Sequence, residues 1–281
     1  MSSGGGQVTR QKVGPRTLCV EQRGEGPPLL QIHGLGLGKS NFAAISPYLS
    51  EFFRTIDYDM SGFGASDAAP PAVTYSDWAD EAIALLKELK IERICVHATS
   101  GGGPVGIEMA AKYPDKVQAL IVSASMGKYD RQALIDSEIK RQNAERIGMR
   151  AVGTLTALQA FTRDFFDSEK FPPAYARMLA AFETLDVKDW CAYQLMREKW
   201  DCGPSLSAIR CPTMFITGAL DVMTPIMAGP TGLGMQQMHE RVPGSEFIVL
   251  DSIGHLILVE GAQQTTREIV AFARKQGLLA P

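Results

Sequence analysis

The chain has no excess of basic residues and no run of like charges. Lys and Arg number 28 against 31 Asp and Glu, which leaves a formal net charge of −3 at pH 7. Proteins that bind nucleic acids carry clustered positive charge, so this composition argues against a nucleic-acid partner. No apolar run is long enough to cross a bilayer, and we expect no membrane span. The first residues also lack the charged and apolar segments of a secretory signal.

Cysteine is scarce, and its spacing forms no pattern. The five cysteines are an odd number without a C-x-x-C pair, so we expect free thiols in a reducing compartment, the cytoplasm. The sequence has no H-E-x-x-H motif and no close His/Cys group, so we predict neither a metal nor a cofactor. With 281 residues, of which 45% are hydrophobic, the chain is long enough for one large core and an inserted subdomain. The oligomeric state stays open.

The chain does contain a serine between an apolar strand and a glycine-rich turn. Residues 94–99 form the strand pattern, Gly101–Gly103 permit a sharp turn, and a helix pattern starts near Pro104. A serine on such a turn presents its hydroxyl at the carboxyl edge of a sheet, as nucleophiles do. We therefore identify Ser100 as the candidate nucleophile, although Ala98 replaces the first glycine of the G-x-S-x-G motif.

Two other glycine patterns suggest phosphate binding, and we favour neither. Gly101, Gly103 and Gly106 fit G-x-G-x-x-G. The strand predicted at 117–125 ends in serine, however, and supplies no carboxylate for a ribose. The segment 33–40 is close to a phosphate-binding loop, but a histidine stands where that motif needs its first glycine.

Strand and helix patterns alternate through the first part of the chain. Two strands, 8–13 and 17–22, form a hairpin, and strands at 29–32, 54–59 and 94–99 follow with helical segments between them. This alternation predicts an α/β fold with a mostly parallel sheet that helices cover on both faces.

The strand pattern stops over about 80 residues before the sheet resumes. Helices are expected there at 131–149, 154–166, 173–185 and 188–200. A long block without strands, set between two strands of one sheet, predicts an inserted cap over the carboxyl edge of the sheet. We therefore divide the chain into a flexible tail of residues 1–7, a core of residues 8–126 and 209–281, and a helical cap of residues 127–208.

The cap is rich in large apolar side chains. Most of them should pack the cap against itself and the core, because a pocket is lined mainly by apolar side chains but uses few of them. The candidates for the substrate pocket are Phe161, Phe165, Trp190, Tyr193 and Met196.

Two further polar residues follow strands in the second part of the chain. Asp221 comes after the strand at 211–218, and His255 comes after the strand at 246–251. The carboxyl ends of parallel strands share one edge, so both side chains should lie near Ser100. A serine hydroxyl needs an imidazole to take its proton, and the imidazole needs a carboxylate that holds its tautomer. We predict that Ser100, His255 and Asp221 form a catalytic triad.

The glycine-rich loop after the strand at 29–32 can serve the same reaction. An oxyanion hole takes one backbone N–H from the residue after the nucleophile and one from a loop in this position. We expect these donors to be Gly101 and Leu35.

Several short motifs together resemble the α/β-hydrolase family. They are His33-Gly34, Gly62–Ser66, Ala98–Gly103, Tyr113–Val117, Gly218–Asp221 and Gly254-His255. The resemblance implies an eight-stranded, mostly parallel sheet with the nucleophile after the fifth strand and the acid after the seventh. Haloalkane dehalogenases and epoxide hydrolases of this family carry aspartate at the position of Ser100. Hydrolases of ring-cleavage products usually have asparagine and tryptophan where this chain has Thr99 and Leu256.

The sequence thus predicts a hydrolase that cleaves a carboxylic ester, thioester or lactone through an acyl-enzyme on Ser100. Its partner would be a small-molecule substrate with an apolar portion. Two other outcomes stay open, because a fold does not determine a reaction. In a lyase or cofactor-free oxygenase, His255 would act as a base on the substrate. In a ligand receptor, the same residues would bind with slow turnover.

Overall fold

The computed structural model describes residues 6–280, in which eight strands form one sheet in the order β1-β2-β4-β3-β5-β6-β7-β8. The strands are β1 (Gln7–Val13), β2 (Arg16–Arg23), β3 (Pro28–Ile32), β4 (Arg54–Tyr58), β5 (Ile94–Thr99), β6 (Val117–Ser123), β7 (Thr213–Gly218) and β8 (Glu246–Leu250). β1 pairs antiparallel with β2 and β2 antiparallel with β4, and the other neighbouring pairs are parallel. The prediction of an eight-stranded, mostly parallel sheet is confirmed.

Burial along the strands follows their place in the sheet. Every residue of β5 and β7 is buried, as expected for parallel strands with helices on both faces. β1, at the edge, is mostly exposed. It begins at Gln7, which pairs with Gln22, so the last residue of the predicted tail belongs to the sheet. Gly6 precedes the strand and is half-buried, and residues 1–5 of the predicted tail lie outside the described residues.

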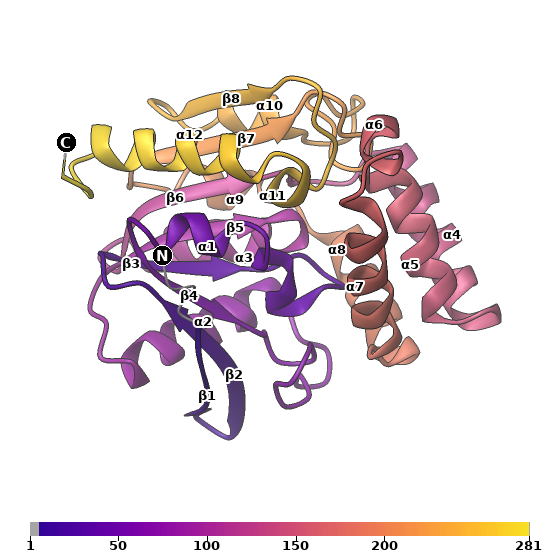
Figure 1. The fold of residues 1–281 in the computed structure, drawn as a ribbon, viewed down its shortest axis with the longest axis horizontal. Helices are drawn as coiled ribbons and strands as arrows, with labels where there is room; N and C mark the ends of the chain where they lie inside the picture. The colour runs from indigo at the N-terminus through magenta and orange to yellow at the C-terminus, as the bar shows by residue number, and fades with distance from the viewer. Residues whose placement is uncertain (1–5, 281) are drawn as a thin grey trace.

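Helices cover both faces of the sheet (Figure 1). Those outside the predicted cap are η1 (Gly38–Phe42), α1 (Ser46–Leu49), α2 (Tyr75–Glu88), η2 (Ser100–Gly102), α3 (Gly103–Lys112), α10 (Met235–His239), α11 (Ile257–Glu260) and α12 (Ala262–Lys275). The short helix α9 (Gly203–Leu206) lies near the end of the predicted cap. Neighbouring residues of β5 point to opposite faces, Val96 into a buried cluster with Trp78 of α2 and Cys95 into a second cluster with Ile269 of α12. The sheet therefore has an apolar core on each side.

A helical segment separates β6 from β7. Its main helices are α4 (Arg131–Arg146), α5 (Met149–Ala160), α6 (Arg163–Phe166), α7 (Phe171–Glu183) and α8 (Val187–Lys199). In Figure 1 these helices stack against one another beyond the carboxyl ends of the strands. Phe182 of α7 and Trp190 of α8 belong to the same buried cluster as Trp78, so the segment packs directly on the sheet and its helices.

One helix predicted in this segment has the wrong bounds. The sequence pattern indicates a single helix over 154–166, whereas the structure has α5, which starts at Met149, followed by the separate helix α6. Phe161 has an extended backbone that ends α5. The side chain of Thr162 then accepts the N–H of Phe165 at 3.3 Å and caps α6. Within residues 6–280, no helix combines the length and apolar character needed to span a bilayer.

Candidate active site

Ser100 lies on a tight turn between β5 and α3. Its φ of +50° is in the left-handed region, which costs energy for a residue with a side chain and is kept at functional sites. The turn also requires Gly102, because a Cβ there would lie 2.4 Å from the carbonyl oxygen of His33. The hydroxyl of Ser125 donates to the carbonyl oxygen of Ser100 at 2.7 Å. These contacts hold the hydroxyl of Ser100 at the carboxyl edge of the sheet.

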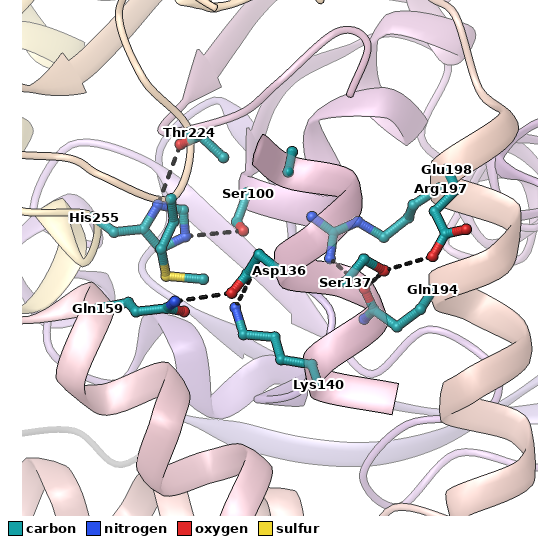
Figure 2. A network of polar contacts seen from close by, with 12 residues as sticks. Ser100, Asp136, Ser137, Lys140, Gln159, Gln194, Arg197, Glu198, Thr224 and His255 are labelled. Carbon is teal, nitrogen blue, oxygen red and sulfur yellow. Dashed lines mark hydrogen bonds and ion pairs between the residues drawn. The ribbon is translucent and has the colours of Figure 1, made fainter. Parts of the chain in front are cut away.

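The structure brings together the serine, histidine and aspartate that the sequence singles out. Ser100 Oγ lies 3.0 Å from His255 Nε2, and His255 Nδ1 lies 2.9 Å from Asp221 Oδ2. Figure 2 shows the imidazole ring of His255 directed at the hydroxyl of Ser100. Asp221 can only accept, so Nδ1 carries the proton and Nε2 presents a lone pair to the serine hydroxyl. This is the tautomer that a general base for the serine requires.

Asp221 is buried and accepts hydrogen bonds through both oxygens. Oδ1 accepts the N–H groups of Met223 and Thr224 at 2.8 and 2.9 Å, and Oδ2 accepts the hydroxyl of Thr224 at 2.6 Å. Burial alone would raise the pKa of this carboxyl. The neighbouring His255 and the donors from Thr224 outweigh it, so the pKa lies below the ordinary value of 3.8. Asp221 is therefore a carboxylate at neutral pH, ready to stabilise an imidazolium on His255.

The loop that carries His255 is attached to the helical segment. The backbone N–H of His255 donates to the carbonyl oxygen of Ala160 at 3.0 Å. Two residues further along the helical segment, Thr162 donates its N–H and its hydroxyl to the carboxylate of Glu260 at 2.9 and 2.7 Å. The position of the imidazole therefore depends on contacts between α5, α6 and α11.

The backbone N–H groups of Leu35 and Gly101 lie next to Ser100. A Cβ placed on Gly101 would lie 3.1 Å from the backbone nitrogen of Leu35, so the two backbones approach each other closely. Gly101 is the second residue of η2, where N–H groups have no intrahelical acceptor. The N–H of Gly34, the residue before Leu35, is already donated to Asn41 Oδ1 at 3.0 Å. The loop thus brings the backbone of Leu35 next to that of Gly101, the residue after Ser100.

His33 holds this loop in place. Its Nε2 accepts the N–H of Met60 at 3.0 Å, and its Nδ1 lies 2.8 Å from the carbonyl oxygen of Gly34. Burial lowers the pKa of His33 below its ordinary value. The ring is therefore neutral, as its role as an acceptor requires, and it acts on the loop that contains Leu35 rather than on a substrate.

A cavity opens in front of Ser100, and both apolar and polar side chains line it. The apolar side chains are Leu35, Leu37, Met178, Phe182, Trp190, Met223, Leu256 and Leu258. The polar and charged side chains are Asn41, Thr99, Ser100, Tyr129, Asp136, Lys140, Thr156, Gln194, Arg197, Thr224 and His255. The cavity therefore offers a ligand both apolar surface and charged groups.

Of the five pocket residues proposed from the sequence, Trp190 lines this cavity and the other four do not. Phe161 lines a smaller pocket beside it, and the Phe165 ring stacks on that of Phe161 with their centroids 4.8 Å apart. Tyr193 and Met196 line a groove on the outer side of α8. The apolar character of these residues does not show which side of its helix each one occupies, and packing of the helices decides it.

The sequence alone did not identify the charged residues of the cavity, Asp136, Lys140 and Arg197, or the neighbouring Gln194. Asp136 and Lys140 lie four residues apart on α4, and Gln194 and Arg197 lie three apart on α8. Trp190 and Gln194 are also four apart, so Trp190, Gln194 and Arg197 share one helix face. A polar pair on the same face as a buried tryptophan is the signal that could have identified them. Across residues 6–280, no group of three His, Cys, Asp or Glu side chains is placed to hold a metal ion.

The sheet, the strained serine turn and the side chains at the sheet's carboxyl edge define the class of α/β-hydrolases. Residues 27–262 match the family model of the alpha/beta hydrolase fold, and the chain belongs to that family.

Several of its relatives are hydrolases. A pimeloyl-(acyl-carrier protein) methyl ester esterase of Shewanella sp. (strain MR-7) is 30% identical over 219 residues, which cover 76% of this chain and 80% of that protein. A 2-(acetamidomethylene)succinate hydrolase of Mesorhizobium japonicum is 30% identical over 152 residues, 54% of this chain and 53% of that protein. The enol-lactonase from Burkholderia xenovorans LB400 shares the fold, with a TM-score of 0.84 at 22% identity over 95% of this chain and 100% of that one. The chain is an enzyme of the hydrolase type.

Proposed function

We propose that this enzyme cleaves a carboxylic ester, thioester or lactone through an acyl-enzyme on Ser100. The observation that carries the proposal is the continuous hydrogen-bonded chain from Ser100 Oγ through the His255 ring to Asp221. A serine hydroxyl is activated in this way when a neutral imidazole faces it and a carboxylate fixes the ring.

The reaction would proceed in two halves. Ser100 Oγ attacks the carbonyl carbon while His255 Nε2 takes the hydroxyl proton, and the N–H groups of Leu35 and Gly101 bind the resulting oxyanion. The protonated His255 then gives its proton to the leaving alcohol or thiol, and an ester to Ser100 remains. Water, deprotonated by His255, attacks this ester and releases the acid, which restores the serine hydroxyl.

The helical segment would act as a cap that binds the substrate. Met178 and Phe182 of α7 and Trp190 of α8 form an apolar wall of the cavity in front of Ser100. An apolar part of the substrate placed there would be removed from water, and each buried CH₂ group would contribute about 0.8 kcal/mol. We infer from this wall that the substrate is a small molecule with an apolar portion.

A fluorophosphonate probe and the variant Ser100→Ala test the proposal. We expect the probe to attach to Ser100 and to abolish ester hydrolysis. We expect Ser100→Ala to lower kcat by roughly 10⁶-fold while the thermal unfolding midpoint stays near that of the wild type. Hydrolysis at near-normal rate in Ser100→Ala would reject Ser100 as the nucleophile. Resistance to the probe together with turnover that still requires His255 would favour a lyase or oxygenase reaction instead.

A further inference from the structure

Arg197 presents a positive charge to the cavity close to Ser100. The two residues line the main cavity together, and they also line a smaller one beside Gly101 and Pro104. In Figure 2 the guanidinium group extends from α8 toward Ser100, on the side of the serine away from His255. A ligand that reacts at Ser100 therefore lies next to this cation.

No carboxylate of the described residues forms an ion pair with Arg197, although the charge of Asp136 acts on it from further away. Within residues 6–280, no Asp or Glu oxygen lies within 4.0 Å of the guanidinium nitrogens. The adjacent Glu198 instead accepts hydrogen bonds from Ser137 at 2.9 Å and from Arg141 at 3.2 Å. A cation withdrawn from water without a counter-ion is costly, and such groups are normally paired.

The other cation of the cavity differs in this respect. Lys140 Nζ lies 2.6 Å from Asp136 Oδ2, and Gln159 donates to the second oxygen of Asp136 at 2.8 Å. The positive charge of Lys140 is therefore balanced within the protein. The excess positive charge of the cavity lies at Arg197.

The guanidinium of Arg197 is held in place but keeps donors for a ligand. Its Cζ lies 5.0 Å from the centroid of the Tyr129 ring, and Nη1 donates to Gln194 Oε1 at 3.3 Å. That bond uses one N–H of the five that an arginine carries, and the hydroxyl of Tyr75 faces the guanidinium as a second partner. Three N–H groups then remain. The N–H groups of a guanidinium point outward in its own plane, where a carboxylate can bind through two parallel bonds.

From these contacts we infer that Arg197 binds a carboxylate group of the substrate, so that the substrate is an ester, thioester or lactone that also carries a free carboxylate. This inference rests on the proposed function for the bond that is cleaved, and it adds the substrate's charge. The apolar wall formed by Met178, Phe182 and Trp190 would contact the rest of the molecule. Arg197 would then determine specificity without taking part in the proton transfers.

The experiment compares esters that differ only in charge. Monomethyl succinate is paired with methyl succinamate for a carboxylate on the acyl side, and O-acetylglycolate with O-acetylglycolamide for one on the alcohol side. In one of the two pairs, we expect kcat/KM of the wild type to be about 10- to 10²-fold higher for the carboxylate ester than for its carboxamide. A factor of this size corresponds to one hydrogen bond to a charged group. Arg197→Met should lower kcat/KM for the carboxylate ester far more than for its carboxamide, which removes this preference.

Two variants serve as controls. Arg197→Lys keeps the charge but loses the paired donors, so it should retain part of the preference, and it replaces Arg197→Met if that variant does not fold. Arg150→Met removes an exposed arginine of α5 that pairs with Glu183, and it should change nothing. Equal rates for both members of each pair in the wild type, or an equal loss for both in Arg197→Met, would overturn the inference.

Binding separates this inference from the proposed function. In Ser100→Ala, isothermal titration with monomethyl succinate should show binding that disappears when Arg197→Met is added. Binding of this kind without hydrolysis by the wild type would keep the carboxylate site and reject the proposed reaction. Hydrolysis of neutral esters without any dependence on Arg197 would keep the reaction and reject the carboxylate site.

Discussion

The carbonyl oxygen of Ala160 accepts the backbone N–H of His255 at 3.0 Å. Ala160 is the last residue of α5, and His255 follows β8, so this hydrogen bond, together with that from the N–H of Leu256 at 3.4 Å, joins the helical segment to the loop that carries the base. A movement of α5 relative to the sheet would displace the imidazole from Ser100. Packing of the helical segment and activation of the serine are therefore linked.

The variant Glu260→Ala tests this link. Glu260 accepts both donors of Thr162, and its removal leaves a partly buried N–H without a partner. We expect the free energy of unfolding to fall by about 1–3 kcal/mol, together with a lower kcat because the support of His255 is weakened. Urea unfolding and steady-state kinetics measure the two effects. Glu169→Ala, which removes an exposed glutamate between α6 and α7, should stay within about 0.5 kcal/mol of the wild type. Equal behaviour of the two variants would contradict the link.

Asp221→Asn should lower kcat without unfolding the protein. An asparagine amide can donate to His255 Nδ1 and so stabilise the tautomer that has its proton on Nε2, where the serine proton must go. The same change in a serine protease lowers kcat by about 10⁴-fold, and we expect a loss of that order here. Asp251→Asn, an exposed aspartate at the end of β8, is the matched control. A loss below about tenfold would show that Asp221 does not orient the imidazole.

Gly102→Ala should disturb the serine turn. The added Cβ would lie 2.4 Å from the carbonyl oxygen of His33 and 2.6 Å from that of Ile32, and backbone atoms cannot move aside as side chains do. We expect a lower thermal unfolding midpoint and a loss of turnover that exceeds the loss of stability. At Gly229, the nearest atom to an added Cβ is Asp130 Oδ2 at 3.3 Å, so Gly229→Ala should leave turnover intact. Full activity in Gly102→Ala would show that the turn can relax.

His97 predicts a dependence of stability on pH. It is fully buried between Gln31 and Ser123, and burial lowers its pKa from 6.5 to about 3. Between pH 3 and 6.5, His97 of the unfolded chain binds a proton, whereas His97 of the folded chain does not. The contribution of His97 to the free energy of unfolding is therefore complete above pH 6.5 and falls as the pH is lowered toward 3. In His97→Gln, the slope of the unfolding free energy should be smaller by up to about 1.4 kcal/mol per pH unit. Urea unfolding between pH 4 and 7 measures it, and an unchanged slope would refute the assignment.

Much of the sheet and the positions of Ser100, Asp221 and His255 could be predicted because the signals are local. A buried parallel strand is a short apolar run, and a polar residue directly after it lies at the carboxyl edge of the sheet. The bounds of α5 and α6 could not be predicted in the same way. Thr162, which begins α6, is held by Glu260, 98 positions away in the chain, and no pattern near Thr162 indicates that partner.

The amino-acid sequence by itself determined the order of strands and helices, the strained turn at Ser100, and which residues follow the strands that carry the reaction. Only the tertiary structure decided what surrounds the hydroxyl. Trp190 and Arg197 face the cavity while Tyr193 and Met196 face away from it, and Arg197 has no carboxylate partner among residues 6–280. The physical reason is that the rotation of α8 about its axis depends on the helices packed against it. The charge of the cavity likewise depends on which acids lie near in space rather than in sequence.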